Sequence, residues 1–441
     1  MTRFSLVCFL LVGLSLPVFA QNDRWAFSFG SGAASKGEIA VPVSMDYNDE
    51  TGYGFDYGTH PQEFTALRVS NKDFITGCRS DKPFYFSVRL PEGNYDVKLL
   101  LGGTQEPSMT TVRAESRRLM LAHVSTAKGK TSSQSFTVNI RNARINDSVS
   151  VKIKPREKAK LNWDNKLTFE FGDKNAAVIA IEISRNTTAP TVFLCGNSTV
   201  VDQDNDPWCG WGQMFTSFFG SGVAIANYAE SGEAANTFIS ARRLAKLLTQ
   251  MKKGDYLFME FGHNDQKQKG EGIGPWTSYQ QSLQKFIDET RKRGAFPVIV
   301  TSMHRRNFDA DGKAINTLGD YPEAARQLAQ KNHVPLIDLN AMSKVLYEAW
   351  GPEQSVKAFV HYKAGTFAGQ TADLADNTHF NAYGGYELAK CIVEGAIANK
   401  LDFMKYLRPE YKRFDPAHPD AFDSVSFLLS PFVSVEKPDG N

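Results

Sequence analysis

The sequence predicts an α/β protein in which an antiparallel β-sandwich precedes a three-layer αβα part with about five parallel strands. Between residues 22 and 184, short alternating runs are separated by turn residues, and no long helical period appears. From residue 191 onward, apolar strands alternate with helical stretches, as in a parallel sheet covered by helices on both faces. A length of 441 residues also exceeds one usual core, which favours two domains.

The first part is predicted to span residues 21–184. Turn residues at 91–94 are typical of a hairpin between the first two of its strands. A polar segment that ends in Pro190 is the predicted linker, at residues 185–190. The clearest strands are 84–90, 95–101, 136–140, 149–153, 167–171 and 178–183.

The second part is predicted to span residues 191–401, and sites in such folds form at the carboxyl ends of the strands. Residues 402–441 are rich in Pro and Asp and form a predicted C-terminal extension on the surface. The predicted strands are 191–195, 223–227, 256–261, 296–301 and 334–338, and the predicted helices are 233–252, 277–293, 322–331 and 381–398.

Residues 1–20 have the pattern of a secretory signal peptide: a basic residue, an apolar stretch, then small residues before the cleavage point. We therefore expect an exported protein, periplasmic or extracellular, with no membrane span, because no later segment offers about 20 uninterrupted apolar residues. A net charge of +2 argues against a nucleic-acid partner. The four cysteines after residue 20 match no zinc pattern, so we expect mostly buried thiols, with one disulfide left open.

Ser198 follows the first parallel strand in a Gly-x-Ser-Thr turn, and Asp376 and His379 precede the last predicted helix. A serine hydroxyl becomes a nucleophile when an imidazole takes its proton and a carboxylate orients that imidazole. The Asp-x-x-His spacing lets one segment supply both partners. Taken singly, the serine is as well explained by a turn and the pair by a helix cap beside a surface histidine.

Gly232 and Asn264 follow the next two strands, so they lie at the same predicted sheet edge as Ser198. A backbone N–H at a helix start and a neutral side-chain amide both suit the oxyanion of a tetrahedral intermediate. The alternatives are an ordinary strand-to-helix turn and an Asx turn. The joint arrangement of nucleophile, activating pair and donors favours a hydrolase.

These four blocks resemble the SGNH (GDSL-like) hydrolase superfamily over roughly residues 191–401, and residues 261–265 and 376–380 are most similar to those of rhamnogalacturonan acetylesterases. The resemblance implies a flavodoxin-like fold with no cofactor and no metal. It also implies Ser198 as nucleophile, His379 as base, Asp376 as its orienting residue, and an oxyanion hole made by Gly232, Asn264 and the Ser198 backbone N–H.

One position departs from the family pattern, because Asn197 stands where an aspartate is usual. Asparagine keeps a carbonyl acceptor, so we expect activity to survive.

Possible substrate contacts are Arg305 and Arg306, which could grip a uronate carboxylate, His263, and Trp208, which could stack on a sugar. A solvated basic turn, a supporting hydrogen bond and a core position are the respective alternatives. The N-terminal sandwich resembles galactose-binding-like modules by pattern and position. Its aromatics could form a sugar platform or simply belong to the core, namely Tyr47, Tyr53, Phe55, Tyr57 and Trp163.

The expected activity is that of a secreted carbohydrate esterase, which removes acetyl groups from pectic polysaccharide (rhamnogalacturonan) through an acyl-enzyme. Its expected partner is acetylated pectic polysaccharide or oligosaccharide. Two alternatives stay open: an esterase on another ester, such as acetylated xylan or a lipid, and a carbohydrate-binding protein with a degenerate hydrolase domain.

Overall fold

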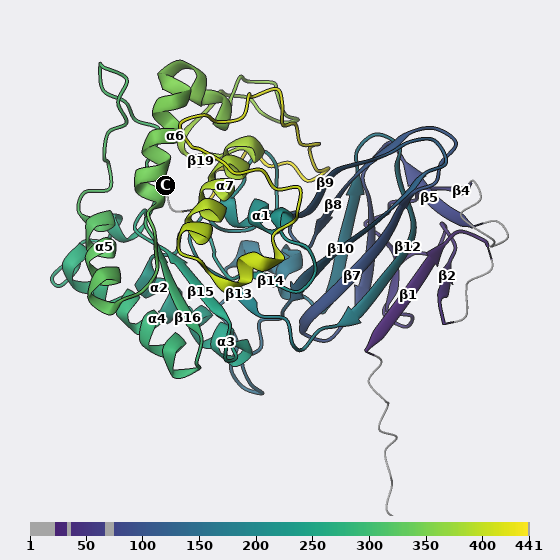
Figure 1. Cartoon of the computed structure of the whole chain (residues 1–441), viewed down its shortest axis with the longest axis horizontal. Coiled ribbons are helices and arrows are strands. Elements are labelled where there is room, and N and C mark those ends of the chain that lie inside the picture. The colour runs from purple at the N-terminus through teal and green to yellow at the C-terminus, as the bar shows by residue number, and fades with distance from the viewer. Residues whose placement is uncertain (1–22, 33–36, 67–74, 440–441) are drawn as a thin grey trace, which may run out of the picture.

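The computed structural model describes residues 23–32, 37–66 and 75–439, so the predicted signal peptide at 1–20 lies outside the described residues. A single twelve-stranded sheet runs through both parts of the molecule, in the order β17-β16-β15-β13-β14-β10-β7-β12-β1-β2, with β4 and β5 off this path (Figure 1). The sandwich lies at one end of this sheet and the helix-covered part at the other.

Five parallel strands form the helix-covered end, as the sequence predicts. Their order is β14-β13-β15-β16-β17, so the first strand in sequence lies between the second and the third, which is the flavodoxin-like order. The crevice at the carboxyl end of β13 is therefore a switch point where sites form. The strands are β13 (Thr191–Gly196), β14 (Ala224–Asn227), β15 (Tyr256–Glu260), β16 (Phe296–Val300) and β17 (Leu336–Ile337).

Helices cover both faces of these strands, and each face has its own apolar cluster. Trp211 and Leu388 belong to one cluster, and Phe238 and Phe286 to the other. The predicted helix 233–252 is two helices, because Arg242 adopts a left-handed conformation (φ 65°) between them. The helices are α1 (Trp211–Phe215), α2 (Ala235–Ser240), α3 (Arg243–Gln250), α4 (Gln280–Lys292), α5 (Tyr321–Asn332), α6 (Leu339–Gln354) and α7 (Ala382–Ala398).

Short turns of other helix types occur in both parts of the molecule. One π-helical turn, η5 (Pro275–Tyr279), leads into α4. The 3₁₀ turns are η1 (Pro155–Ala159), η2 (Leu161–Trp163), η3 (Thr216–Phe218), η4 (Asp265–Lys267), η6 (Ser355–Ala358) and η7 (Asp402–Tyr406).

The sandwich packs a five-stranded sheet, in the order β3-β6-β11-β8-β9, against its share of the long sheet. Aromatic rings fill the space between them; Phe27 and Phe86, for example, meet edge to face with centroids 5.3 Å apart. The strands are β1 (Arg24–Phe29), β2 (Ile39–Val41), β3 (Tyr53–Asp56), β4 (Gln62–Thr65), β5 (Thr76–Ser80), β6 (Phe84–Arg89), β7 (Gly93–Gly102), β8 (Ser108–Ala114), β9 (Arg118–Thr126), β10 (Thr131–Ile140), β11 (Lys166–Gly172) and β12 (Ala176–Arg185).

Two local predictions for the sandwich are wrong. The turn at 91–94 does not close a hairpin, because β6 and β7 belong to different sheets and the chain crosses between them. β6 and β7 lie on opposite sides of one core, and each buries side chains in it, such as Phe86 and Tyr95. Residues 149–153 form no strand, only an isolated bridge from Ser150 to Arg144.

The two parts are joined through the sheet and through buried ion pairs. β10 pairs antiparallel with β7 and parallel with β14. Arg118, fully buried, lies 3.2 Å from Asp202, and Arg117 is hydrogen-bonded to Asp206. The acidic residues after Ser198 therefore tie the sandwich to the helix-covered part.

After α6 and η6 the chain adds a two-stranded sheet of β18 (Phe359–Tyr362) and β19 (Leu374–Phe380), and after η7 it runs back toward the sandwich (Figure 1). This C-terminal segment is anchored where the Ser430 N–H donates to Asp206. Within the described residues, no helix is both long and apolar enough to cross a membrane. The four cysteines in the same residues are buried, unpaired thiols.

Candidate active site

Ser198 lies in the turn that follows β13. The Asn197 carbonyl accepts the N–H of Val200 at 3.0 Å, and the Gln203 side-chain amide donates to the Ser198 carbonyl at 2.9 Å. The next helix, α1, begins only at Trp211, so the serine does not lie at the start of a helix. The turn itself holds the serine at the carboxyl end of β13.

His379 lies between Ser198 and Asp376, within hydrogen-bonding distance of both. His379 Nε2 lies 2.8 Å from Ser198 Oγ, and His379 Nδ1 lies 3.0 Å from Asp376 Oδ2. The other carboxylate oxygen accepts the backbone N–H groups of Thr378 and His379, at 2.7 and 2.8 Å. The pair, which the sequence places just before the last predicted helix, is part of strand β19, and this strand fixes its position.

The protonation states of His379 and Asp376 follow from their surroundings. Burial lowers the pKa of His379, the Asp376 carboxylate raises it in part, and Lys437 and Lys267 lower it further, so the pKa lies below the ordinary value. Burial alone would raise the pKa of Asp376, but the hydrogen bonds and charge of His379 outweigh it and hold that pKa well below the ordinary value. Near neutral pH, the imidazole is a neutral acceptor beside an ionised carboxylate.

Gly232 and Asn264 lie at the same sheet edge. The loop that contains Gly232 is tied to the end of β13, because the Glu230 N–H donates to the Gly196 carbonyl at 3.2 Å. Asn264 is buried, and one N–H of its amide donates to the Glu233 carbonyl at 3.1 Å. An amide has a second N–H to offer.

Gly232 has a φ of +81°, a left-handed conformation that favours glycine. α2 begins at Ala235 and has only six residues, so the helix potential expected at Gly232 is small. Lys154 and Arg156, from the sandwich side, bring positive charge to this loop instead.

Trp208 covers the imidazole. Its ring meets the His379 ring edge to face, with centroids 5.5 Å apart, and its indole N–H donates to the Ser434 carbonyl at 2.8 Å. Only 3% of Trp208 is exposed, so it shields the base and does not offer an open stacking face. His263 is also buried, and its Nδ1 lies 3.7 Å from a carboxylate oxygen of Glu260. It therefore lies in the protein interior and not on an open surface.

The two arginines differ in their surroundings. Arg306 is engaged by Ser355 and Asn377, at 2.9 and 3.1 Å, and so braces β19. Arg305 is half-buried and donates to Thr317 and the His263 carbonyl. Burial lowers the pKa of Arg305, and the charge of Asp376 raises it in part.

Lys267 adds another positive charge beside Arg305. Partial desolvation, together with the charges of Arg305 and Lys437, lowers the pKa of Lys267 to about 8. Lys437 Nζ lies 3.2 Å from Asp376 Oδ2. Lys437 belongs to the C-terminal segment, whose arrival here no motif or spacing in the sequence indicates.

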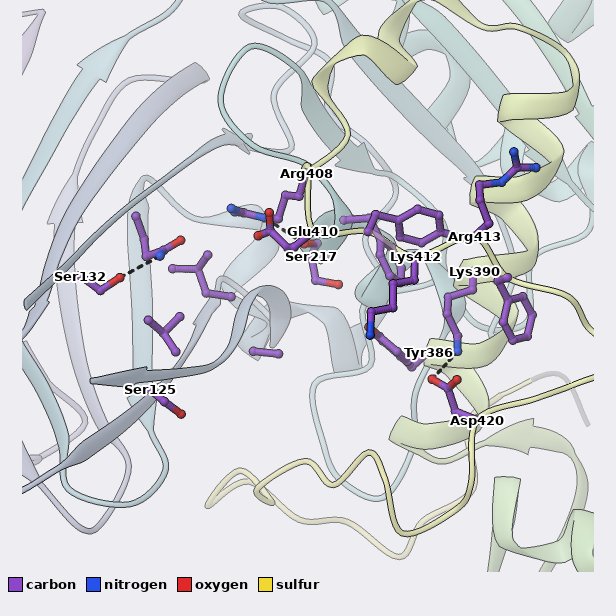
Figure 2. A pocket seen from close by; sticks show the side chains of 17 residues that line it. Ser125, Ser132, Ser217, Tyr386, Lys390, Arg408, Glu410, Lys412, Arg413 and Asp420 are labelled. Atoms are coloured by element: carbon purple, nitrogen blue, oxygen red, sulfur yellow. Dashed lines mark hydrogen bonds and ion pairs between the residues drawn. The ribbon is translucent and has the colours of Figure 1, made fainter. Parts of the chain in front are cut away.

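Two cavities lie near the junction of the parts. A cavity of about 140 Å³ opens beside Trp208 and Gln203, and residues 434–439 form one side of it. A second, of about 500 Å³, is lined by Ser125 and Ser132 of the sandwich and by Tyr386 and Arg408 on the other side (Figure 2). Its walls come from elements other than those that carry Ser198 and His379. In the described part of the chain, no group of three or more His, Cys, Asp or Glu residues could hold a metal ion.

Comparison with known proteins finds relatives of both parts of the chain. Residues 194–385 match the model of the GDSL-like lipase/acylhydrolase family, and residues 25–154 match a beta-agarase/YXIM esterase-like, galactose-binding domain-like model. A rhamnogalacturonan acetylesterase of Bacillus subtilis, RhgT, is 45% identical over 206 residues, which cover 46% of this chain and 88% of that protein. The chain belongs to the GDSL-like lipase/acylhydrolase family. As a GDSL-like protein it is a carboxylic-ester hydrolase.

Other relatives extend the comparison across both parts. The uncharacterized esterase YxiM of Bacillus subtilis is 25% identical over 389 residues, 85% of this chain and 91% of that protein. The probable rhamnogalacturonan acetylesterase YesY, also of Bacillus subtilis, is 32% identical over 207 residues, 46% of this chain and 91% of that protein. The crystal structure of the YxiM protein aligns with a TM-score of 0.44 and 23% identity, over 86% of this chain and 99% of that structure.

Proposed function

We propose that this GDSL-like hydrolase is an exported carbohydrate esterase that removes acetyl groups from pectic polysaccharide, with Ser198 as its nucleophile. The observation that carries the proposal is the hydrogen-bonded series Ser198–His379–Asp376, with contacts of 2.8 and 3.0 Å. Export is supported by the signal-like pattern of residues 1–20.

The reaction follows from this series. His379 Nε2 takes the Ser198 proton as Oγ attacks the acetyl carbonyl carbon. The oxyanion is stabilised by the Ser198 and Gly232 backbone N–H groups and by the amide of Asn264. Collapse of the intermediate breaks the bond to the sugar oxygen, which leaves with the proton held by His379.

Deacylation repeats these steps with water. His379 takes a proton from a water molecule, which attacks the acetyl-enzyme, and acetate departs as Ser198 regains its proton. Asp376 holds the imidazole in the orientation that presents Nε2 to the serine throughout.

The cavity beside Trp208, the residue that covers His379, is small and largely polar. The cavity next to Trp208 has a volume of about 140 Å³, and charged or amide side chains form much of its wall, among them Lys160, Gln203 and Lys437. A long acyl chain needs an extended apolar groove. The cavity therefore supports an acetyl ester over a long-chain lipid ester.

An acidic glycan is supported by the charges around the site. Lys267, Arg305 and Lys437 bring positive charge close to the Asp376 carboxylate. Positive charge of this kind attracts an anionic group, and the carboxylate of a uronic acid next to the acetylated position is such a group. The likeness to RhgT, a rhamnogalacturonan acetylesterase, points the same way.

The test is acetate release by the purified protein from acetylated rhamnogalacturonan, acetylated homogalacturonan, acetylated xylan and a long-chain aryl ester. We expect the highest kcat/KM on rhamnogalacturonan and little activity on the long-chain ester. A preference for xylan would contradict the pectic substrate while leaving the esterase intact. A preference for the long-chain ester would contradict the acetylesterase itself.

A further inference from the structure

A segment of the sandwich side reaches the loop that carries Gly232. The Lys154 ammonium donates to the Ser231 carbonyl at 2.6 Å, and the Arg156 guanidinium donates to the same oxygen at 3.0 Å. Both residues lie at η1, far in sequence from the parallel sheet. One carbonyl near the site thus accepts hydrogen bonds from two cations of the other part of the molecule.

That carbonyl belongs to the peptide whose N–H is the Gly232 donor. In a trans peptide the N–H points opposite to the C=O, so two cations on the Ser231 oxygen direct the Gly232 N–H away from the sandwich. Hydrogen bonds to a carbonyl also polarise its peptide, which makes the N–H on the other side a stronger donor. This orientation and polarisation are what a donor to a developing oxyanion needs.

We propose that Lys154 and Arg156 are positioning residues of the esterase reaction, which orient and polarise the Ser231–Gly232 peptide for oxyanion binding. The proposal rests on the proposed function, because it takes Gly232 as an oxyanion donor. It gives the sandwich a part in catalysis in addition to any sugar binding.

Neighbouring contacts hold the two cations in place. The buried carboxylate of Glu230 accepts from Arg156 at 2.5 Å, from Lys160 at 2.9 Å and from the Ser231 N–H at 3.0 Å. Burial alone would raise the pKa of Glu230, but the charges of Lys160, Arg243 and Arg156 lower it to about 2. This carboxylate therefore stays ionised and fixes Arg156 beside the peptide.

Lys154 is fixed in a similar way and lies close to the glycine itself. Its ammonium is 3.2 Å from a carboxylate oxygen of Glu233. A Cβ atom added at Gly232 would lie 3.1 Å from that ammonium, closer than usual contact. The ammonium thus packs directly against the backbone that it orients. The side chains of Lys154 and Arg156 are 28% and 31% exposed, so each can be replaced without leaving a sealed cavity.

The test compares Lys154→Met, Arg156→Met and Lys154→Arg in the full chain, on a small aryl acetate that reports chemistry and not glycan binding. We expect kcat to fall about tenfold in each Met variant with KM nearly unchanged, a fraction of what deleting an oxyanion donor costs. Lys154→Arg keeps the charge and should restore most of kcat. The double Met variant should lose less than the product of the single losses, because both cations share one acceptor. Lys158→Met, on the exposed side of the same turn, is the matched control and should leave kcat unchanged.

Site counting separates positioning from folding. End-point labelling of Ser198 with a fluorophosphonate should give the same stoichiometry in every variant, while the labelling rate falls in the Met variants. Equal kcat per labelled site in Lys154→Met and the unaltered protein would overturn the inference, and so would a loss that Lys154→Arg does not repair. If Ser198→Ala itself retains activity, the proposed function has failed; if it is inactive and Lys154→Met is normal, only the positioning role has failed.

Discussion

Lys437 Nζ lies 3.2 Å from Asp376 Oδ2, so the carboxylate that orients His379 also faces a cation from the C-terminal segment. The positive charge of Lys437 lowers the pKa of His379, after the larger effect of burial and against the effect of Asp376. Lys437 thus takes part in setting the pH range over which the imidazole is a neutral base.

The first prediction concerns the acid limb of the pH profile. His379 must be neutral to take the serine proton, and its pKa lies below the ordinary value, so the midpoint of the acid limb of kcat/KM should lie below that of an unperturbed histidine. Lys437→Met removes a charge that lowers this pKa, so its acid limb should move to higher pH, whereas Lys437→Arg should keep it in place. A profile of acetate release between pH 4 and pH 9 checks this. A limb that stays fixed or moves to lower pH in Lys437→Met contradicts the assignment.

A second prediction concerns Asn197, the position that departs from the family pattern. Its Oδ1 accepts the Thr199 N–H and hydroxyl, at 3.1 and 2.8 Å, while its Nδ2 has no hydrogen-bond partner among the described residues. Asn197→Asp keeps the acceptor and loses no donor bond, so kcat/KM should stay within about threefold. Asn197→Ala leaves the buried Thr199 N–H without its acceptor, whereas the Thr199 hydroxyl keeps Glu260 Oε2 at 3.1 Å, and should cost about 1–3 kcal/mol of stability. Denaturant unfolding and aryl acetate kinetics measure both, and a large activity gain in Asn197→Asp would show that asparagine impairs the site.

The third prediction separates the two neighbouring arginines. Arg305→Met should raise KM by about tenfold on an acidic pectic oligosaccharide, the loss of one charge-assisted hydrogen bond, and leave a small aryl acetate unaffected. Arg306→Met should lower kcat on both substrates, because Arg306 braces Asn377 between Asp376 and His379. Equal effects of Arg305→Met on both substrates would contradict uronate binding.

Stability of the junction provides a fourth prediction. Arg118 is fully buried, and Arg118→Met removes the guanidinium that lies 3.2 Å from the buried Asp202 carboxylate, at a cost of about 3–5 kcal/mol. The exposed pair of Arg24 and Glu182 is the control, since Arg24→Met should change the free energy of unfolding by less than about 1 kcal/mol. Urea unfolding compares the two variants, and similar losses would show that the buried pairs do not hold the parts together.

The architecture could be predicted from the sequence because its patterns are local. Apolar runs such as 191–195 and 256–261 mark buried parallel strands whatever lies around them, and β13 and β15 confirm both. The break of the helix 233–252 at Arg242 was not predictable, since nothing in the residue's type favours a left-handed conformation. The supposed hairpin at 91–94 failed because a turn signal does not say whether the next strand pairs in the same sheet or crosses to the other.

The candidate site likewise contains residues that the sequence indicates and residues that only the structure shows. Ser198, Asp376 and His379 lie within short motifs, and the structure brings them together at hydrogen-bonding distance. Lys154 and Lys437 reach the site only through the tertiary arrangement of the sandwich and the C-terminal segment. A lysine in a polar stretch has no signature that sets it apart from a solvated one, so these contacts required the structure.

The most direct test of the account is acetate release from acetylated rhamnogalacturonan by Ser198→Ala, with the folded state checked by thermal unfolding. His379 and Asp376 keep their places without the hydroxyl, so the account predicts a folded protein whose kcat is lower by a factor of about 10⁴ or more. A folded Ser198→Ala protein that releases acetate at the unaltered rate would contradict it.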